Sequence, residues 1–131
     1  GLQVEAGSVA TAFERRPSAL ELWLCQRYFR KSYEAATVPG TITDAGKISF
    51  PRFDTTQQTS LTWPQPMRAT PTVTVYSPVS GTAARLYDEH DAMDRDATVD
   101  NVSTMGFSVG TVTALGTGWA QSIHYKAEAE L

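Results

Sequence analysis

The chain has 131 residues, of which 41% are hydrophobic and 19% charged, and its formal net charge is −3. This length suits one compact domain with a short appendage, and the apolar share is enough for a core, which excludes wholesale disorder. The acidic balance argues against binding to nucleic acid or to anionic membranes, and no apolar run approaches the roughly 18–20 residues of a membrane-spanning helix.

The two ends of the sequence indicate a domain taken from a longer protein. The chain begins at Gly1 rather than Met, without the basic stretch and apolar core that open a secretion signal. Its last residues, 125–131, continue a strand-like pattern without a tail. We therefore expect a domain that closes a longer polypeptide.

The first 36 residues have a helical or mixed character. Residues 18–21, Ser-Ala-Leu-Glu, have the form of a capping box, in which the Ser18 hydroxyl accepts from the Glu21 amide and the Glu21 side chain reaches back. Pro17 precedes them and suits a helix start, so the pattern predicts a short helix over roughly residues 19–25. Residues 25–33 continue this helix or form a strand, and their Tyr and Phe content favours the strand.

From residue 41 onward, turn signals separate short runs of β-forming residues. Alternation places Val73 and Val75 inward, and it places Leu61 beside Trp63, which we expect in the core. The polar segment 88–96 is expected to be a loop. Many short strands without an ordinary helix between them predict an all-β fold, an antiparallel β-sandwich preceded by a short N-terminal α-helix. The expected strands cover residues 46–53, 59–63, 72–77, 83–87, 101–105, 106–112 and 119–129.

The sequence lacks a recognisable catalytic apparatus. No phosphate-binding glycine loop, zinc-binding His-Glu-x-x-His motif or nucleophile elbow is present, and the two histidines, His90 and His124, lie in different settings. The single cysteine, Cys25, excludes a disulfide framework, and among aromatic neighbours it is expected to be a small buried hydrophobe. Residues 88–96 hold enough oxygen ligands for Ca²⁺ but lack EF-hand spacing. We expect no enzymatic activity, no cofactor and no metal site.

The N-terminal segment resembles a linker found in bacteriophage tail-fibre proteins. Residues 3–17, QVEAGSVATAFERRP, are similar to the family stretch LEAGSVATPFE-RP, with Ala12 in the place of a proline, and residues 21–29, ELWLCQRYF, are similar to ELxLCQRYY. In that family, the first stretch leaves one domain and the second enters the C-terminal domain. On this resemblance, residues 1–5 end a missing upstream module. The chain then divides into a linker over 1–17, a short helix and first strand over 18–36, and a C-terminal tip domain over 37–131.

The rest of the chain resembles the C-terminal β-sandwich of phage fibres and, more distantly, the H-type lectins. The matching pieces are residues 66–75, 101–109 and 125–127. In these lectins the last motif is W-x-A, and nearby strand residues help to bind sugar between the subunits of a trimer. Tyr125 stands at the tryptophan position here. For Trp119 and Tyr125, both packing in the core and recognition at the surface remain open.

The resemblance implies a receptor-binding tip at the distal end of a virion tail fibre. We expect it to adhere as a homotrimer to a bacterial cell-surface glycan or protein, without nucleic acid and without membrane insertion. The large apolar side chains Leu20, Leu22, Trp23 and Leu24 are expected to pack against neighbouring chains near the three-fold axis. The candidate ligand-binding residues are Tyr87, Asp88, His90, Asp91, Trp119, His124 and Tyr125.

Two other interpretations predict different behaviour. A purely structural domain that trimerises or caps the fibre, or attaches it, predicts no affinity for cells. An enzyme that cleaves surface polysaccharide predicts release of reducing sugar and needs a pair of facing carboxyl groups that the sequence does not reveal.

Overall fold

The computed structural model describes residues 9, 17–51, 58–111 and 120–129. The strands form an eight-stranded antiparallel sheet in the order β1-β8-β5-β6-β7-β3, with β2 and β4 also paired to β8. The expected all-β fold with a short N-terminal helix is confirmed. The elements are α1 (Ser18–Cys25), β1 (Phe29–Lys31), β2 (Ile48–Pro51), β3 (Thr59–Thr62), β4 (Thr72–Tyr76), β5 (Arg85–Asp88), β6 (Met93–Ser103), β7 (Gly106–Thr111) and β8 (Ala120–Glu128).

Strand β8 lies at the centre of the sheet. Its first half pairs with β2 and β5, and its second half pairs with β1 and β4. Because β8 has partners on both edges, its backbone hydrogen bonds are shielded from water. Residues 121–124 of this strand are also buried in succession, so both of its faces are covered.

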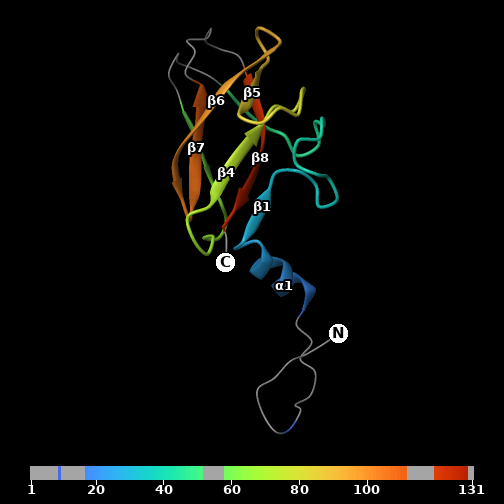
Figure 1. The fold of residues 1–131 in the computed structure, drawn as a ribbon, viewed down its shortest axis with the longest axis vertical. Coiled ribbons are helices and arrows are strands. Elements are labelled where there is room, and N and C mark those ends of the chain that lie inside the picture. Colours follow the sequence, from blue (N-terminus) through green and yellow to red (C-terminus); the bar gives the residue numbers. More distant parts are fainter. Residues whose placement is uncertain (1–8, 10–16, 52–57, 112–119, 130–131) are drawn as a thin grey trace.

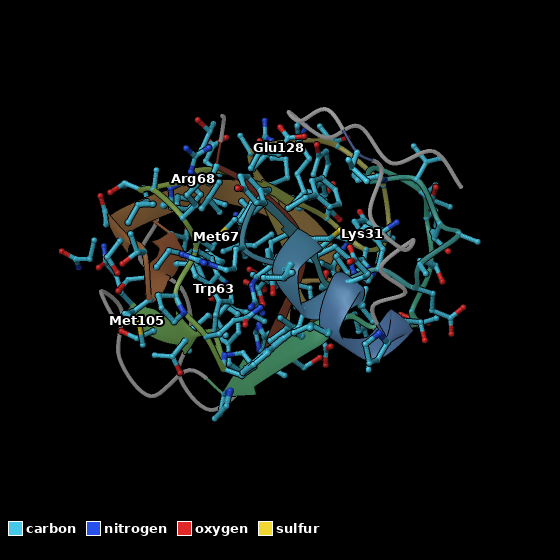
Figure 2. The ribbon with its side chains drawn as sticks, turned by 90° about the horizontal axis from the view of Figure 1, so that it is seen from below. Lys31, Trp63, Met67, Arg68, Met105 and Glu128 are labelled. Atoms are coloured by element: carbon cyan, nitrogen blue, oxygen red, sulfur yellow. The ribbon has the colours of Figure 1, made fainter. Side chains whose placement is uncertain are left out.

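The core lies inside the curled sheet. Val75 and Trp63 are buried in the core, and Val73 and Leu61 are partly buried and pack against it, as the alternation predicted. Burial of each large apolar side chain stabilises the fold by about 1.5–3 kcal/mol. Figure 2 looks into the sheet from the α1 end and shows Trp63 and Met67 within the ring of strands. The buried members are Phe50, Trp63, Met67, Val75, Leu86, Phe107, Val109, Ile123, Ala127 and Ala129.

Two expectations for the helix are wrong. Pro17 rather than Ser18 occupies the cap position, and no side-chain hydrogen bond caps the helix. Extended backbone ends at Pro17, so Ser18 is already helical, and the Pro17 carbonyl accepts from the amides of Leu20 and Glu21 at 3.0 and 3.2 Å. Cys25 is exposed rather than buried, because it ends a helix that buries none of its residues within this chain.

The expected strand 101–105 is instead the end of β6, which runs from Met93 to Ser103, and two other segments also differ from the prediction. Of residues 25–33, only Phe29–Lys31 form a strand, because the helix continues to Cys25 and a turn follows it. The segment 88–96 is a hairpin rather than a long loop, since Met93 to Asp96 pair with β5. An ion pair of 3.0 Å between Arg85 and Asp96 joins the two strands, so charged residues sit opposite each other where the composition suggested a solvated loop.

The two ends of the domain are occupied by different elements. Helix α1 and the last residues of β8 lie at one end, and the connection between β5 and β6 lies at the opposite end (Figure 1). In the described part of the chain, no helix combines the length and the apolar character that crossing a membrane requires.

Candidate functional site

The hairpin between β5 and β6 holds most of the candidate ligand residues. Tyr87 and Asp88 end β5, and His90 and Asp91 lie in the connection that follows. Asp88 is buried, and its Oδ1 accepts from the backbone N–H of His90 at 3.0 Å. The other carboxylate oxygen of Asp88 lies 3.7 Å from Nε of Arg95. The buried carboxylate therefore holds the turn in place, and His90 and Asp91 remain exposed at its surface.

The charges at this hairpin tip are coupled. His90 Nδ1 lies 2.7 Å from Asp91 Oδ1, and the Arg95 guanidinium donates to the other oxygen of Asp91. These contacts lower the pKa of the Asp91 carboxyl, with the hydrogen bond from His90 as the largest cause. Asp91 is thus an exposed carboxylate over most of the pH range. Among the described residues, no group of His, Cys, Asp and Glu side chains is arranged to hold a metal ion.

His124 is not at the surface, so its expected contact with a ligand is not supported. It is fully buried, with Nδ1 lying 2.9 Å from Ser32 Oγ and Nε2 lying 2.9 Å from the Thr43 carbonyl oxygen. Because a carbonyl only accepts, Nε2 carries the proton. The ring also stacks on Tyr33 at a centroid distance of 4.0 Å. His124 therefore attaches the segment between Ser32 and Thr43 to β8.

Tyr125, the next residue, has a mixed environment. Its ring packs edge-to-face against Phe107 at 5.4 Å, and burial raises the pKa of its phenol. It also lines a cavity of about 460 Å³ between α1, β1 and β8. The position of Tyr125 is thus compatible with both core packing and recognition at the surface. Trp119 lies outside the described residues. The other residues around the cavity are Leu22, Gln26, Phe29, Arg30, Lys31, Tyr33 and Ala35.

Helix α1 exposes three of the four apolar residues that were expected at a chain interface, and the fourth, Leu24, is half-buried. Leu22 is 61% exposed and Trp23 is 55% exposed, and Leu20 is also exposed. Leu20, Trp23 and Leu24 line a second cavity, together with Arg27, Pro64, Gln65 and Pro66. The Gln65 side chain donates to the Trp23 carbonyl oxygen at 2.6 Å, which holds the helix against the domain. The helix is therefore held by its backbone and leaves its large side chains uncovered by this chain.

The structure separates the candidates into two groups. Tyr87, Asp88, His90 and Asp91 lie together at the hairpin end, whereas Tyr125 lies in the cavity next to α1. Arg30, which is buried and lines the cavity, was not among the candidates that the sequence indicated, although a charged residue in the middle of a predicted strand was a signal for it. Comparison of the chain with protein-family models, curated proteins and solved structures gave no match.

Proposed function

We propose that this chain is the receptor-binding tip of a bacteriophage tail fibre, at the distal end of the fibre on the virion. It adheres as a homotrimer to a glycan or protein of the bacterial surface. The observation that carries this proposal is the difference between the two ends of the domain. The α1 end exposes large apolar side chains, and the opposite end presents a polar hairpin (Figure 1).

The α1 end supports assembly of several chains. Contiguous exposed apolar surface usually marks an interface, and Leu22 and Trp23 line different cavities beside the same helix. A three-fold ring needs two different complementary surfaces on each chain, because every contact joins unlike patches. The two cavities beside α1 give each chain two different surfaces for such contacts, and the linker resemblance supports attachment of the rest of the fibre at this end.

The hairpin end supports recognition. His90 and Asp91 are exposed side chains that offer a hydrogen-bond donor and acceptors, and Arg95 and Asp88 hold them in position from below. Such groups are suited to the hydroxyl groups of a glycan or the polar groups of a protein. Three copies at one tip prolong attachment even when each contact is weak, because rebinding occurs at a high effective concentration.

Adsorption to bacterial cells tests this proposal. The fluorescently labelled chain is incubated with a panel of bacterial strains, and bound fluorescence is measured after washing. We expect retention on at least one strain, and a reduction of about tenfold or more for the double variant His90→Ala, Asp91→Asn, because weakened sites multiply in a trimer. Asp44→Asn is the matched control, since Asp44 is exposed and lies in another loop. Absence of adsorption to every strain, or equal adsorption by all three proteins, contradicts the proposal.

A purely structural role is the second candidate. It is favoured by α1, whose eight residues are all unburied within this chain and therefore available for assembly. This alternative predicts a stable trimer that adsorbs to no strain, so solution mass and cell adsorption together separate the two functions.

A further inference from the structure

We propose that two neighbouring loops, residues 38–43 and 77–82, form a docking surface for a protein loop of the bacterial surface that carries an apolar side chain beside a basic one. The inference rests on the proposed function and narrows its ligand from a glycan or protein to a protein. It is carried by an aliphatic patch, Val38, Ile42 and Val79, which these two uncharged loops expose beside the recognition hairpin.

The two loops are packed directly against each other. The Thr43 amide donates to the Pro78 carbonyl oxygen at 3.2 Å. Gly40 and Gly81 meet so closely that a Cβ added to Gly81 would lie 2.1 Å from the Gly40 carbonyl oxygen, and the same Cβ would lie 3.6 Å from a side-chain carbon of Ile42. The exposed side chains of the two loops therefore belong to one continuous surface.

Each loop is also held in place by the rest of the domain. The Gly40 amide donates to the phenol oxygen of the buried Tyr33 at 3.0 Å. The Ser77 hydroxyl accepts from the Val79 amide at 3.2 Å and donates to the Asp94 carboxylate at 2.5 Å. A surface that is already ordered loses little conformational freedom on binding, so its contacts contribute more fully to affinity.

The aliphatic patch combines high exposure with an absence of charge. Val38 is 71% exposed, Ile42 is 65% exposed and Val79 is 48% exposed. Neither loop contains a charged residue, although 19% of the chain is charged. Exposed apolar side chains without charges are typical of the centre of a protein–protein interface, which is depleted in charge and surrounded by a polar rim.

The recognition hairpin supplies a polar rim beside the patch. The turn over residues 44–47 follows the first loop, and the Lys47 ammonium in it lies 3.9 Å from the Glu89 carboxylate in the connection between β5 and β6. Strand β4 runs towards the hairpin end, so the second loop, which follows β4, lies on that side as well (Figure 1). Glu89 and Asp91 present part-exposed carboxylates at the hairpin. A partner that complements both features has an apolar side chain next to a basic one, since opposite charges across an interface orient the two partners.

The aliphatic character of the patch favours a protein over a glycan. Sugar rings are bound by stacking on the flat faces of aromatic side chains, whereas this patch offers branched aliphatic side chains. Among the described residues, the exposed aromatic side chains are Trp23, Tyr28 and Phe29. These residues lie in α1 and directly after it, at the end of the domain away from the hairpin (Figure 1).

Selective treatment of the cells tests the class of the partner. The fluorescently labelled full chain is added to cells of an adsorbing strain that are untreated, treated with proteinase K, or treated with sodium periodate, which cleaves the vicinal diols of sugars. We expect proteinase K to reduce adsorption at least about tenfold and periodate to change it less than about twofold, because the contacts of all three chains with a protein are lost together. Loss of adsorption after periodate would assign the ligand to a glycan and overturn the proposal. Adsorption that survives proteinase K would also overturn it.

Substitutions in the patch test its part in binding. The double variant Ile42→Ser, Val79→Ser should reduce adsorption at least about tenfold, because apolar contacts at the centre of an interface dominate its affinity. The melting temperature should change little, because both side chains are largely exposed. Met105→Ser is the matched control, since Met105 is 50% exposed and lies in the turn between β6 and β7 at the α1 end (Figure 2). Val38→Ser should also weaken adsorption, and it provides the test if the double variant melts at a lower temperature. Equal adsorption by the parent chain, the patch variants and Met105→Ser would overturn the proposal.

Failure of this inference is distinguishable from failure of the proposed function. Periodate-sensitive adsorption that needs His90 and Asp91 but not the aliphatic patch would retain the receptor-binding tip and refute this inference alone. Absence of adsorption to every strain would refute the receptor-binding role, and this inference with it.

Discussion

Replacement of His124 by alanine should destabilise the fold rather than merely weaken a surface contact. The imidazole joins β8 to Ser32 and to Thr43, with two contacts of 2.9 Å, and it stacks on Tyr33. Alanine leaves the Thr43 carbonyl without this donor and opens a cavity in a site with no exposure. A lost buried hydrogen-bond partner costs about 1–3 kcal/mol, and truncation of a buried ring to alanine costs about 3–5 kcal/mol in total.

Urea denaturation followed by circular dichroism measures this change. At a fixed chain concentration, His124→Ala should lower the free energy of unfolding by about 3–5 kcal/mol. For a domain of this size, at about 3–5 °C per kcal/mol, the melting temperature should fall by about 9–25 °C. The matched control is His90→Ala, whose side chain is 44% exposed and which should change stability by less than about 1 kcal/mol.

The difference in stability loss between His124→Ala and His90→Ala decides whether His124 has a structural role. A loss below about 1 kcal/mol for His124→Ala would refute the reasoning, because a fully buried, doubly bonded ring cannot be removed at the cost of a surface side chain. If His124→Ala reduced adsorption to cells without changing stability, His124 would instead be a ligand contact.

Two further predictions concern the loops. Gly46 has φ +80° and an added Cβ would lie 2.1 Å from the Ser32 carbonyl oxygen, so Gly46→Ala should cost more than about 2 kcal/mol in thermal denaturation. Gly40→Ala, with φ +91° but a nearest contact of 3.5 Å, should cost less, and equal losses would contradict this explanation. The pKa of the Asp91 carboxyl, measured by NMR, should lie below its ordinary value of 3.8 and rise in His90→Asn. Since that pKa is lowered on folding, Asp91 contributes stability above its ordinary range and loses it as the pH falls through the lowered pKa; an unchanged pKa in His90→Asn would be inconsistent with the hydrogen bond.

Local patterns were sufficient to predict the strands that have one apolar face. In β4 the alternation of Val73 and Val75 survives in the structure, because one face of this strand meets the core. The hairpin of β5 and β6 was missed because its stability comes from pairing across the two strands. Charged residues such as Arg85 and Asp96 satisfy each other there, while composition alone described them as solvated.

The candidate site was only partly predictable for a related reason. His90 and Asp91 are adjacent in the sequence, so their common position at a turn follows from the local pattern. The hydrogen-bond partners of His124 lie 92 and 81 residues away in the sequence, and a local sequence pattern cannot predict contacts over such separations. The burial of Arg30 and its unpartnered Nε were equally hidden, since both are properties of the folded chain.

Solution mass, determined by light scattering after size exclusion at several concentrations, tests most directly the claim that α1 joins three chains at a fibre tip. The proposal predicts a trimer whose mass does not change on dilution, and a shift to monomer in Trp23→Ser, because Trp23 is 55% exposed and lines the second cavity beside α1. Asp44→Asn should leave the mass unchanged. A monomer at every concentration, or a trimer that is unaffected by Trp23→Ser, would contradict the assembly through α1.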